Sequence, residues 1–170
     1  LEKLVENLAD VRAVLECLPR SATAQQLTSY VSLITGPTPT ALPDGTVGDK
    51  ELHIVLMDNG RSAMREDPVF NQALQCIRCA SCLNVCPVFE RVGGHVYGDV
   101  YTGGIGTILT AFFNEFDDAG ELQNLCLGCG RCKEVCPGKV DIPGLILELR
   151  NRYVAKKGMP ATHKFLFNTV

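Results

Sequence analysis

Two cysteine runs with identical spacing constrain this chain more than any other feature of its sequence. Residues 76–87 read CIRCASCLNVCP and residues 126–137 read CLGCGRCKEVCP, so the pattern C-x2-C-x2-C-x3-C-P occurs twice at an offset of fifty residues. This spacing is typical of bacterial iron–sulfur proteins with two clusters, in which the fourth cysteine of each run ligates the other cluster. Three closely spaced thiolates can wrap one small cubic cluster, and the proline then turns the chain away. Exchanged fourth ligands would tie the two runs together.

We therefore predict two [4Fe–4S] clusters as the cofactors of this chain. The ligands of the first cluster are expected to be Cys76, Cys79, Cys82 and Cys136. Those of the second are expected to be Cys126, Cys129, Cys132 and Cys86. Paired C-x2-C motifs can also bind structural zinc, but zinc takes four ligands per site, and the additional cysteine and the Cys-Pro step exceed that pattern. With both clusters bound, the net charge would change from −3 to about −7.

The nine cysteines among 170 residues fit a disulfide framework less well. Their share is below the roughly 8–10% of a disulfide scaffold, and their number is odd. A chain of this length can also bury a core without covalent cross-links. Cys17 belongs to neither run, and its helical spacing beside Leu18 predicts a small buried apolar side chain.

Composition excludes several classes of protein. Hydrophobic residues make up 46% and charged residues 21%, as in a folded globular chain, and the net charge of −3 gives no basic excess for nucleic acid. The longest mostly apolar stretch, residues 105–113, is shorter than the roughly 20 residues of a membrane-spanning helix. The N-terminal residues lack the apolar segment of a signal peptide. We predict a cytoplasmic protein without a membrane span, in a compartment where thiols stay reduced.

Residues 1–60 are predicted to be the C-terminal part of an α/β domain. Apolar residues with a period of 3.6 indicate a helix over residues 1–18, which Pro19 should end. Residues 30–35 are β-like, residues 36–50 read as a loop, and residues 51–57 read as a buried strand before a turn at 58–60. Two strands cannot form a stable sheet by themselves, so we expect the rest of that sheet upstream of Leu1.

Residues 61–157 are predicted to form a mainly α domain, followed by a tail at 158–170. Asp67 and Pro68 should open a helix that continues to Gln75. Residues 105–118 read as helical, and a further helix should begin at 141–143 with an apolar stripe at Ile142, Leu145, Ile146, Leu149 and Val154. The long helical spacer between the cysteine runs resembles the α-helical ferredoxin fold rather than the small βαββαβ ferredoxin.

Longer tracts around the runs resemble the lactate-utilisation iron–sulfur proteins of bacteria, B component. These tracts are RSATAQQLTSYVSLITGP, ELHIVLMDNGR and DPVFNQALQCIRCASCLNVCPVFERVGGHVYGDVYTGGIG. The resemblance implies an α/β lactate-utilisation (LUD) domain, of which residues 1–60 are the last portion, followed by a helical ferredoxin module with two clusters. Residues 71–106 carry its most specific part.

The same resemblance implies electron relay in the oxidation of L-lactate to pyruvate. The implied partners are a cysteine-rich protein with CCG motifs and a second LUD-domain protein. The sequence shows no evident nucleophile–base or carboxylate pair, so substrate chemistry is expected in the partners. An alternative is the iron–sulfur subunit of a glycolate oxidase- or heterodisulfide reductase-type complex.

Four basic residues lie inside or beside the cysteine runs: Arg78, Arg131, Lys133 and Lys139. They could offset the negative charge of the clusters and tune their reduction potentials. They could equally be solvated surface groups, and the sequence leaves both interpretations open.

Overall fold

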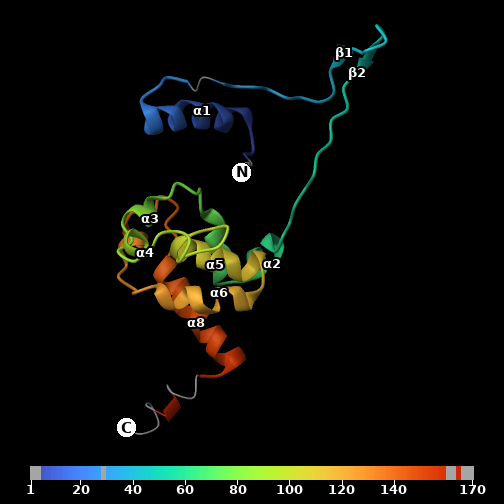
Figure 1. The fold of residues 1–170 in the computed structure, drawn as a ribbon. Helices are drawn as coiled ribbons and strands as arrows, with labels where there is room; N and C mark the ends of the chain where they lie inside the picture. The colour runs from blue at the N-terminus through green and yellow to red at the C-terminus, as the bar shows by residue number, and fades with distance from the viewer. Residues whose placement is uncertain (1–4, 28–29, 160–163, 166–170) are drawn as a thin grey trace. The chain divides into compact units, whose positions relative to one another are not determined.

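The structure, a computed structural model, describes residues 5–27, 30–159 and 164–165. The chain divides into two compact units, Leu1–Val55 and Leu56–Val170 (Figure 1). In the described part of the chain, no helix is both long enough and apolar enough to cross a membrane.

The first unit begins with helix α1 (Leu8–Thr23). The Asn7 side chain caps it by accepting hydrogen bonds from the backbone N–H groups of the second and third helical residues. The prediction that Pro19 ends this helix is wrong. Pro19 lies inside α1, and the helix continues for one more turn to Thr23 before Ala24 closes it in the left-handed conformation, with a φ of 59°. Cys17 is exposed, so its predicted burial is also wrong.

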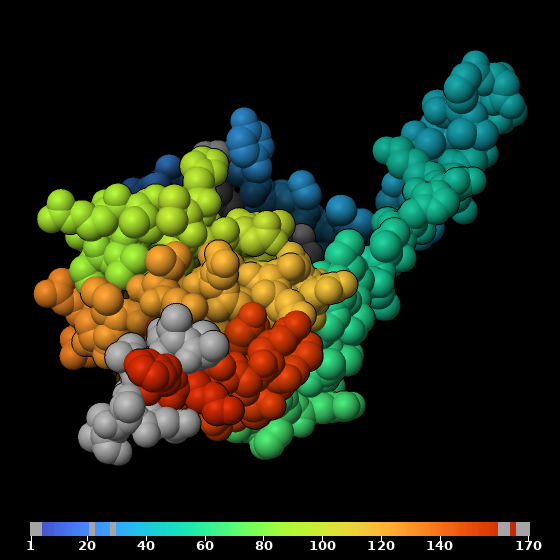
Figure 2. Space-filling model, turned by 60° about the horizontal axis from the view of Figure 1, so that its bottom comes forward, coloured from blue at the N-terminus to red at the C-terminus, as the bar shows by residue number. Residues whose placement is uncertain are grey.

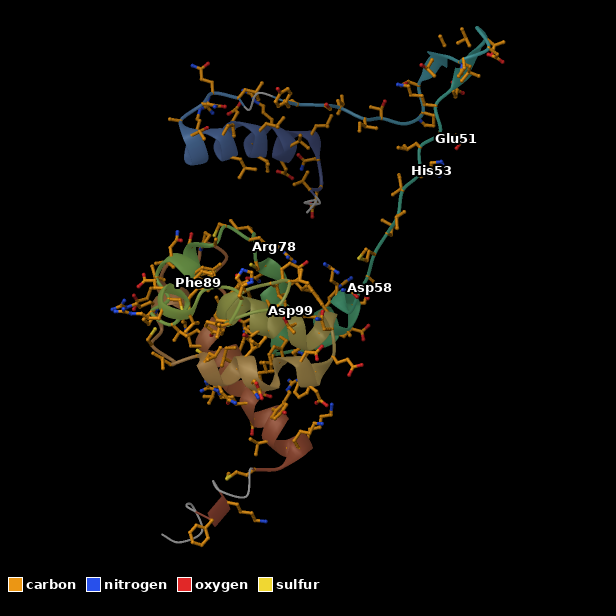
Figure 3. The ribbon with its side chains drawn as sticks, viewed as in Figure 1. Glu51, His53, Asp58, Arg78, Phe89 and Asp99 are labelled. Carbon is orange, nitrogen blue, oxygen red and sulfur yellow. The ribbon has the colours of Figure 1, made fainter. Side chains whose placement is uncertain are left out.

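The expected strands of the first unit are absent from the described residues, and a small hairpin lies in the expected loop. Strands β1 (Pro39–Ala41) and β2 (Val47–Asp49) pair antiparallel, with Thr40 opposite Gly48. Residues 30–35 and 51–57 are irregular. The segment after β2, which carries the labelled Glu51 and His53 in Figure 3, is largely exposed. An apolar run forms a stable strand only when it pairs with a neighbouring strand and is buried. The described residues supply neither the pairing nor the burial for these two segments.

The second unit confirms the mainly α fold. The turn at 58–60 forms as predicted, and Gly60 is required there because its φ is 81° and a Cβ would lie 2.0 Å from the Phe112 carbonyl oxygen. The helices that follow are α2 (Arg61–Glu66), the 3₁₀ helix η1 (Phe70–Gln75), α3 (Ser81–Asn84), α4 (Phe89–Val92), α5 (Gly103–Phe113), η2 (Phe116–Asp118), α6 (Ala119–Leu122), η3 (Gln123–Leu125), α7 (Arg131–Glu134) and α8 (Ile142–Lys157). The predicted helix after Asp67 is therefore a 3₁₀ helix, and the predicted helix 105–118 is broken between α5 and η2.

Helix α5 lies at the centre of this unit and packs against α8, α6 and α2. Its side chains Ile108 and Leu109 are buried, and so are four of the five residues predicted to form the stripe of α8: Ile142, Leu145, Ile146 and Leu149. The fifth, Val154, is 40% exposed. Asp141 caps α8 by accepting a hydrogen bond from the backbone N–H of Gly144. This core gives the cysteine runs a rigid base.

Two arginines of α8 fasten the segments that precede the cysteine runs. Arg152 forms an ion pair with Asp67, just before η1, and its guanidinium lies 4.7 Å from the ring centroid of Phe70. Arg150 donates to the backbone carbonyl of Gln123 in η3 and, at 2.6 Å, to that of Cys126. Figure 2 shows α8, in red, lying against the segments drawn in orange and green.

Candidate functional site

The two cysteine runs follow the same path along the backbone. Each is preceded by a 3₁₀ helix, η1 or η3, whose last residue lies immediately before the first cysteine. The chain then takes two positive φ angles, at Arg78 (58°) and Ala80 (63°) in the first run and at Gly128 (69°) and Gly130 (83°) in the second. Each run ends in a four-residue helix, α3 or α7, before its fourth cysteine. The sequence repeat is therefore also a structural repeat.

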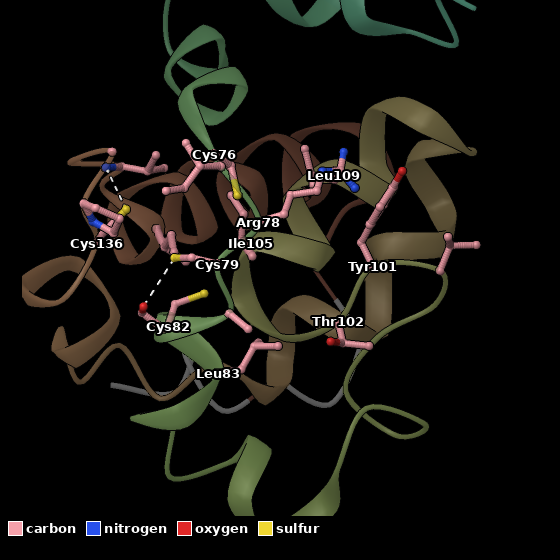
Figure 4. Close-up of a pocket in the computed structure, with 18 residues that line it drawn as sticks. Cys76, Arg78, Cys79, Cys82, Leu83, Tyr101, Thr102, Ile105, Leu109 and Cys136 are labelled. Carbon is pink, nitrogen blue, oxygen red and sulfur yellow. Dashed lines mark hydrogen bonds between the residues drawn. The ribbon is translucent and has the colours of Figure 1, made fainter. Parts of the chain in front are cut away.

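A cavity of about 180 Å³ lies beside the first run (Figure 4). Its lining includes the four thiols of the first predicted set: Cys76, Cys79, Cys82 and Cys136. Three of them come from the first run, and the fourth arrives from the second. The remaining wall is largely apolar, with Ile105 and Leu109 of α5 and Val140 before α8. The site is therefore a half-open apolar pocket with four sulfur donors.

A smaller cavity, of about 30 Å³, lies beside the second run. Its lining includes the second predicted set: Cys126, Cys129, Cys132 and Cys86. Cys82 lines this cavity as well as the first, and α3 packs against α7 between the runs. The structure thus brings each predicted set to one cavity, with the fourth thiol supplied by the other run. Ligation by these sulfurs stays a prediction.

The thiols in each set interact electrostatically. Burial, followed by the neighbouring sulfurs of Cys76, Cys79 and Cys136, raises the pKa of Cys82 to about 11. Burial and neighbouring thiols likewise raise the pKa of Cys132 to about 11. Such crowded thiols resist deprotonation until a cation binds among them. Cys79 differs, because the hydroxyl of Ser81, 3.3 Å from its sulfur, lowers its pKa.

Backbone N–H groups point at several of the sulfurs. Val140 donates to Cys136 Sγ at 3.4 Å, Phe89 donates to Cys86 Sγ at 3.5 Å, and Gly128 donates to Cys126 Sγ at 3.4 Å. Hydrogen bonds of this kind stabilise thiolate ligands and tune a bound metal group. In the described part of the chain, no three His, Cys, Asp or Glu side chains are grouped around one metal-ion position. Four soft sulfur donors around a cavity with apolar walls fit an iron–sulfur cluster.

The basic residues near the runs have different surroundings. Arg78 lines the first cavity, and its guanidinium lies 3.9 Å from the ring centroid of Tyr101. Lys133 pairs with Asp141 at 2.7 Å on the surface. Arg131 and Lys139 are exposed, as expected of solvated surface groups.

Sequence reasoning missed two residues that the structure brings to the second site. Tyr97 lines the second cavity and is 1% exposed. Arg150 reaches the Cys126 carbonyl from α8. Neither belongs to a motif, because tertiary packing alone brings them to the site.

Two known families match different parts of the chain. The family described as 4Fe-4S dicluster domain matches residues 72–140, and the LUD domain family matches residues 1–57. The first match spans both cysteine runs.

Curated relatives match nearly the whole chain. Proteins named Lactate utilization protein B from Bacillus licheniformis and Bacillus subtilis are 42% and 41% identical over 158 residues, which is 93% of this chain. The protein of that name from Geobacillus thermodenitrificans is 40% identical over the same length. The chain spans 32% of the length of each of these relatives. The chain therefore carries a LUD-domain match and a 4Fe-4S dicluster match, and it is similar to the proteins named Lactate utilization protein B over 93% of its length.

Proposed function

We propose that this chain relays electrons in the oxidation of L-lactate to pyruvate, through two [4Fe–4S] clusters held by eight cysteines. The observation that supports this most is the division of eight thiols into two sets of four, each around its own cavity. Each bound cluster would supply a site that accepts and returns one electron. The lactate assignment draws on the relatives named Lactate utilization protein B.

The residues of the chain would hold and shield these sites. The apolar walls from α5 and α8 limit access of water, and backbone N–H groups stabilise the sulfur ligands. Cys79 and Cys129 are exposed while the other six thiols are partly buried. We therefore expect electrons to pass to partner proteins on the side of the first cavity that Cys79 lines and on the side of the second cavity that Cys129 lines.

The stoichiometry of the reaction suits two one-electron sites. Oxidation of the lactate alcohol to a ketone releases two protons and two electrons. We propose that a CCG-motif cysteine-rich protein and a second LUD-domain protein form the rest of a cytoplasmic complex and carry the substrate chemistry. This chain would accept the electrons singly and pass them to the acceptor of the complex.

Anaerobic purification followed by metal and sulfide analysis tests the cofactor. We expect about eight iron and eight sulfide per chain, with EPR signals of reduced [4Fe–4S] clusters after dithionite treatment. Cys17→Ser is the matched control, because Cys17 lies outside both runs and should leave the iron content unchanged. About two zinc per chain without sulfide would refute the relay.

Reduction by substrate tests the lactate assignment. We expect L-lactate to reduce the clusters only when both proposed partners are present. Reduction by glycolate or by a dithiol, but not by lactate, would assign the chain to the alternative class of complex.

A further inference from the structure

Tyr97 is the largest fully buried side chain of the second unit, and it lies among the thiols of the second set. It lines the second cavity together with Cys86, Cys126 and Cys132. Its backbone is fixed on both sides, because its N–H donates to the Gly93 carbonyl at 3.1 Å and its carbonyl accepts from Gly103 at 2.7 Å. The ring therefore has a defined place against the sulfurs.

The Tyr97 side chain lines the second cavity beside Cys126, the first thiol of the second set. On its other side it lies near the start of α5, where a Cβ at Gly104 would be 3.4 Å from the hydroxyl oxygen. A phenol hydroxyl has an ordinary pKa of about 10, so it is protonated at neutral pH and can donate a hydrogen bond. A buried neutral donor thus lies among the predicted ligands of the second cluster.

The corresponding tyrosine at the first cavity has a different arrangement. Tyr101 lines that cavity, but its ring stacks beneath the Arg78 guanidinium and packs edge-on against Phe113. The two sites therefore differ in how a tyrosine faces them.

A hydrogen bond to a ligand sulfur stabilises the cluster more when it is reduced, because the reduced cluster carries more negative charge on sulfur. The effect is stronger in a buried site, where solvent does not screen it. We propose that Tyr97 is a positioning residue that raises the reduction potential of the second cluster by donating a hydrogen bond from its hydroxyl to a sulfur of the second set. This inference rests on the proposed clusters.

Redox titration of the anaerobically purified full chain, followed by EPR, tests the proposal with Tyr97→Phe. We expect two one-electron waves in the wild type and a shift of one of them to lower potential in the variant, with unchanged iron and sulfide content. Cys129→Ser, which removes a predicted ligand of the second set, should abolish the same wave and so identify it as that of the second cluster. Tyr153→Phe is the matched control, since Tyr153 stacks on Phe116 in another part of the unit, and both waves should stay in place.

Two results would overturn the proposal. One is a Tyr97→Phe chain that retains both clusters and both wild-type midpoint potentials. The other is loss of a cluster from Tyr97→Phe, which would make the tyrosine an assembly element rather than a tuning residue. Failure of the proposed function is distinguishable, because the wild type itself would then lack iron and sulfide.

Discussion

The two cysteine runs share a backbone path but not their surroundings. Both take left-handed angles at the same two positions, yet the first run uses Arg78 and Ala80 there while the second uses Gly128 and Gly130. The first borders a cavity of about 180 Å³ and the second one of about 30 Å³. The repeat therefore specifies the predicted ligands, whereas the residues around each run can make two chemically similar sites different.

The helix α8 fastens both runs, again by different means. Arg152 holds the segment before the first run through the carboxylate of Asp67, and Arg150 holds the start of the second run through backbone carbonyls. One helix thus couples the two sites mechanically.

The largest expected effect follows from removing one ligand of either run. Cys76→Ser and Cys126→Ser should each lose one cluster, so that iron falls from about eight to about four atoms per chain. Iron and sulfide analysis of the anaerobically purified variants measures this loss. A variant that keeps all its iron would show that the replaced sulfur is not a ligand.

The next effect separates the two anchors of α8. Arg150→Met and Arg152→Met should each lower the free energy of unfolding by about 2 kcal/mol, because each leaves partly buried polar partners without a charged donor. Urea unfolding measures the loss, and the kinetics of iron release to a chelator show which site is affected. We expect Arg150→Met to accelerate release from one cluster only. Equal acceleration for both clusters would contradict separate anchoring.

A smaller effect tests the backbone difference between the runs. Gly130→Ala should destabilise the fold by about 1 kcal/mol, because its φ is 83° and a side chain is strained there. No atom lies within 4 Å of the added Cβ, so the loss is due to the backbone alone. Ala80→Gly should be neutral or stabilise by up to about 1 kcal/mol, since a more flexible unfolded chain offsets part of the gain. A stabilised Gly130→Ala chain together with a clearly destabilised Ala80→Gly chain in urea unfolding would refute this comparison.

The smallest effect concerns a surface pair that only the second run possesses. Lys133 lies 2.7 Å from Asp141 and is more than half exposed, whereas the equivalent residue of the first run is Leu83. Lys133→Met should change the free energy of unfolding by less than about 1 kcal/mol. A much larger loss in urea unfolding would show that the pair contributes to the α7–α8 junction.

The sequence predicted most of the second unit because its signals are local. Helix α8 begins where Asp141 and Pro143 indicate, and its buried residues follow the apolar period. The cysteine spacing predicted the grouping of thiols around two cavities. The positions of Tyr97 and Arg150 could not be predicted, since contacts distant in sequence determine them.

Prediction failed more often in the first unit, where apolar pattern was interpreted as burial. Residues 51–57 end in a continuous apolar run that predicted a buried strand, but Val55 and Leu56 are 85% and 92% exposed. Strand formation depends on neighbouring strands, and pattern alone does not supply them. Pro19 is the opposite case, because there a predicted helix end does not occur. A proline near a helix end is tolerated when the turn that follows is closed by its own cap.

The exchange of fourth ligands is the central claim, and iron analysis of paired serine variants tests it most directly. If Cys136 belongs with Cys76, the double variant Cys76→Ser/Cys136→Ser loses one cluster and keeps about four iron atoms per chain. The double variant Cys126→Ser/Cys136→Ser then affects both clusters and keeps almost none. The reverse result, four iron atoms in the second double variant and almost none in the first, would contradict the exchange and assign each run its own cluster.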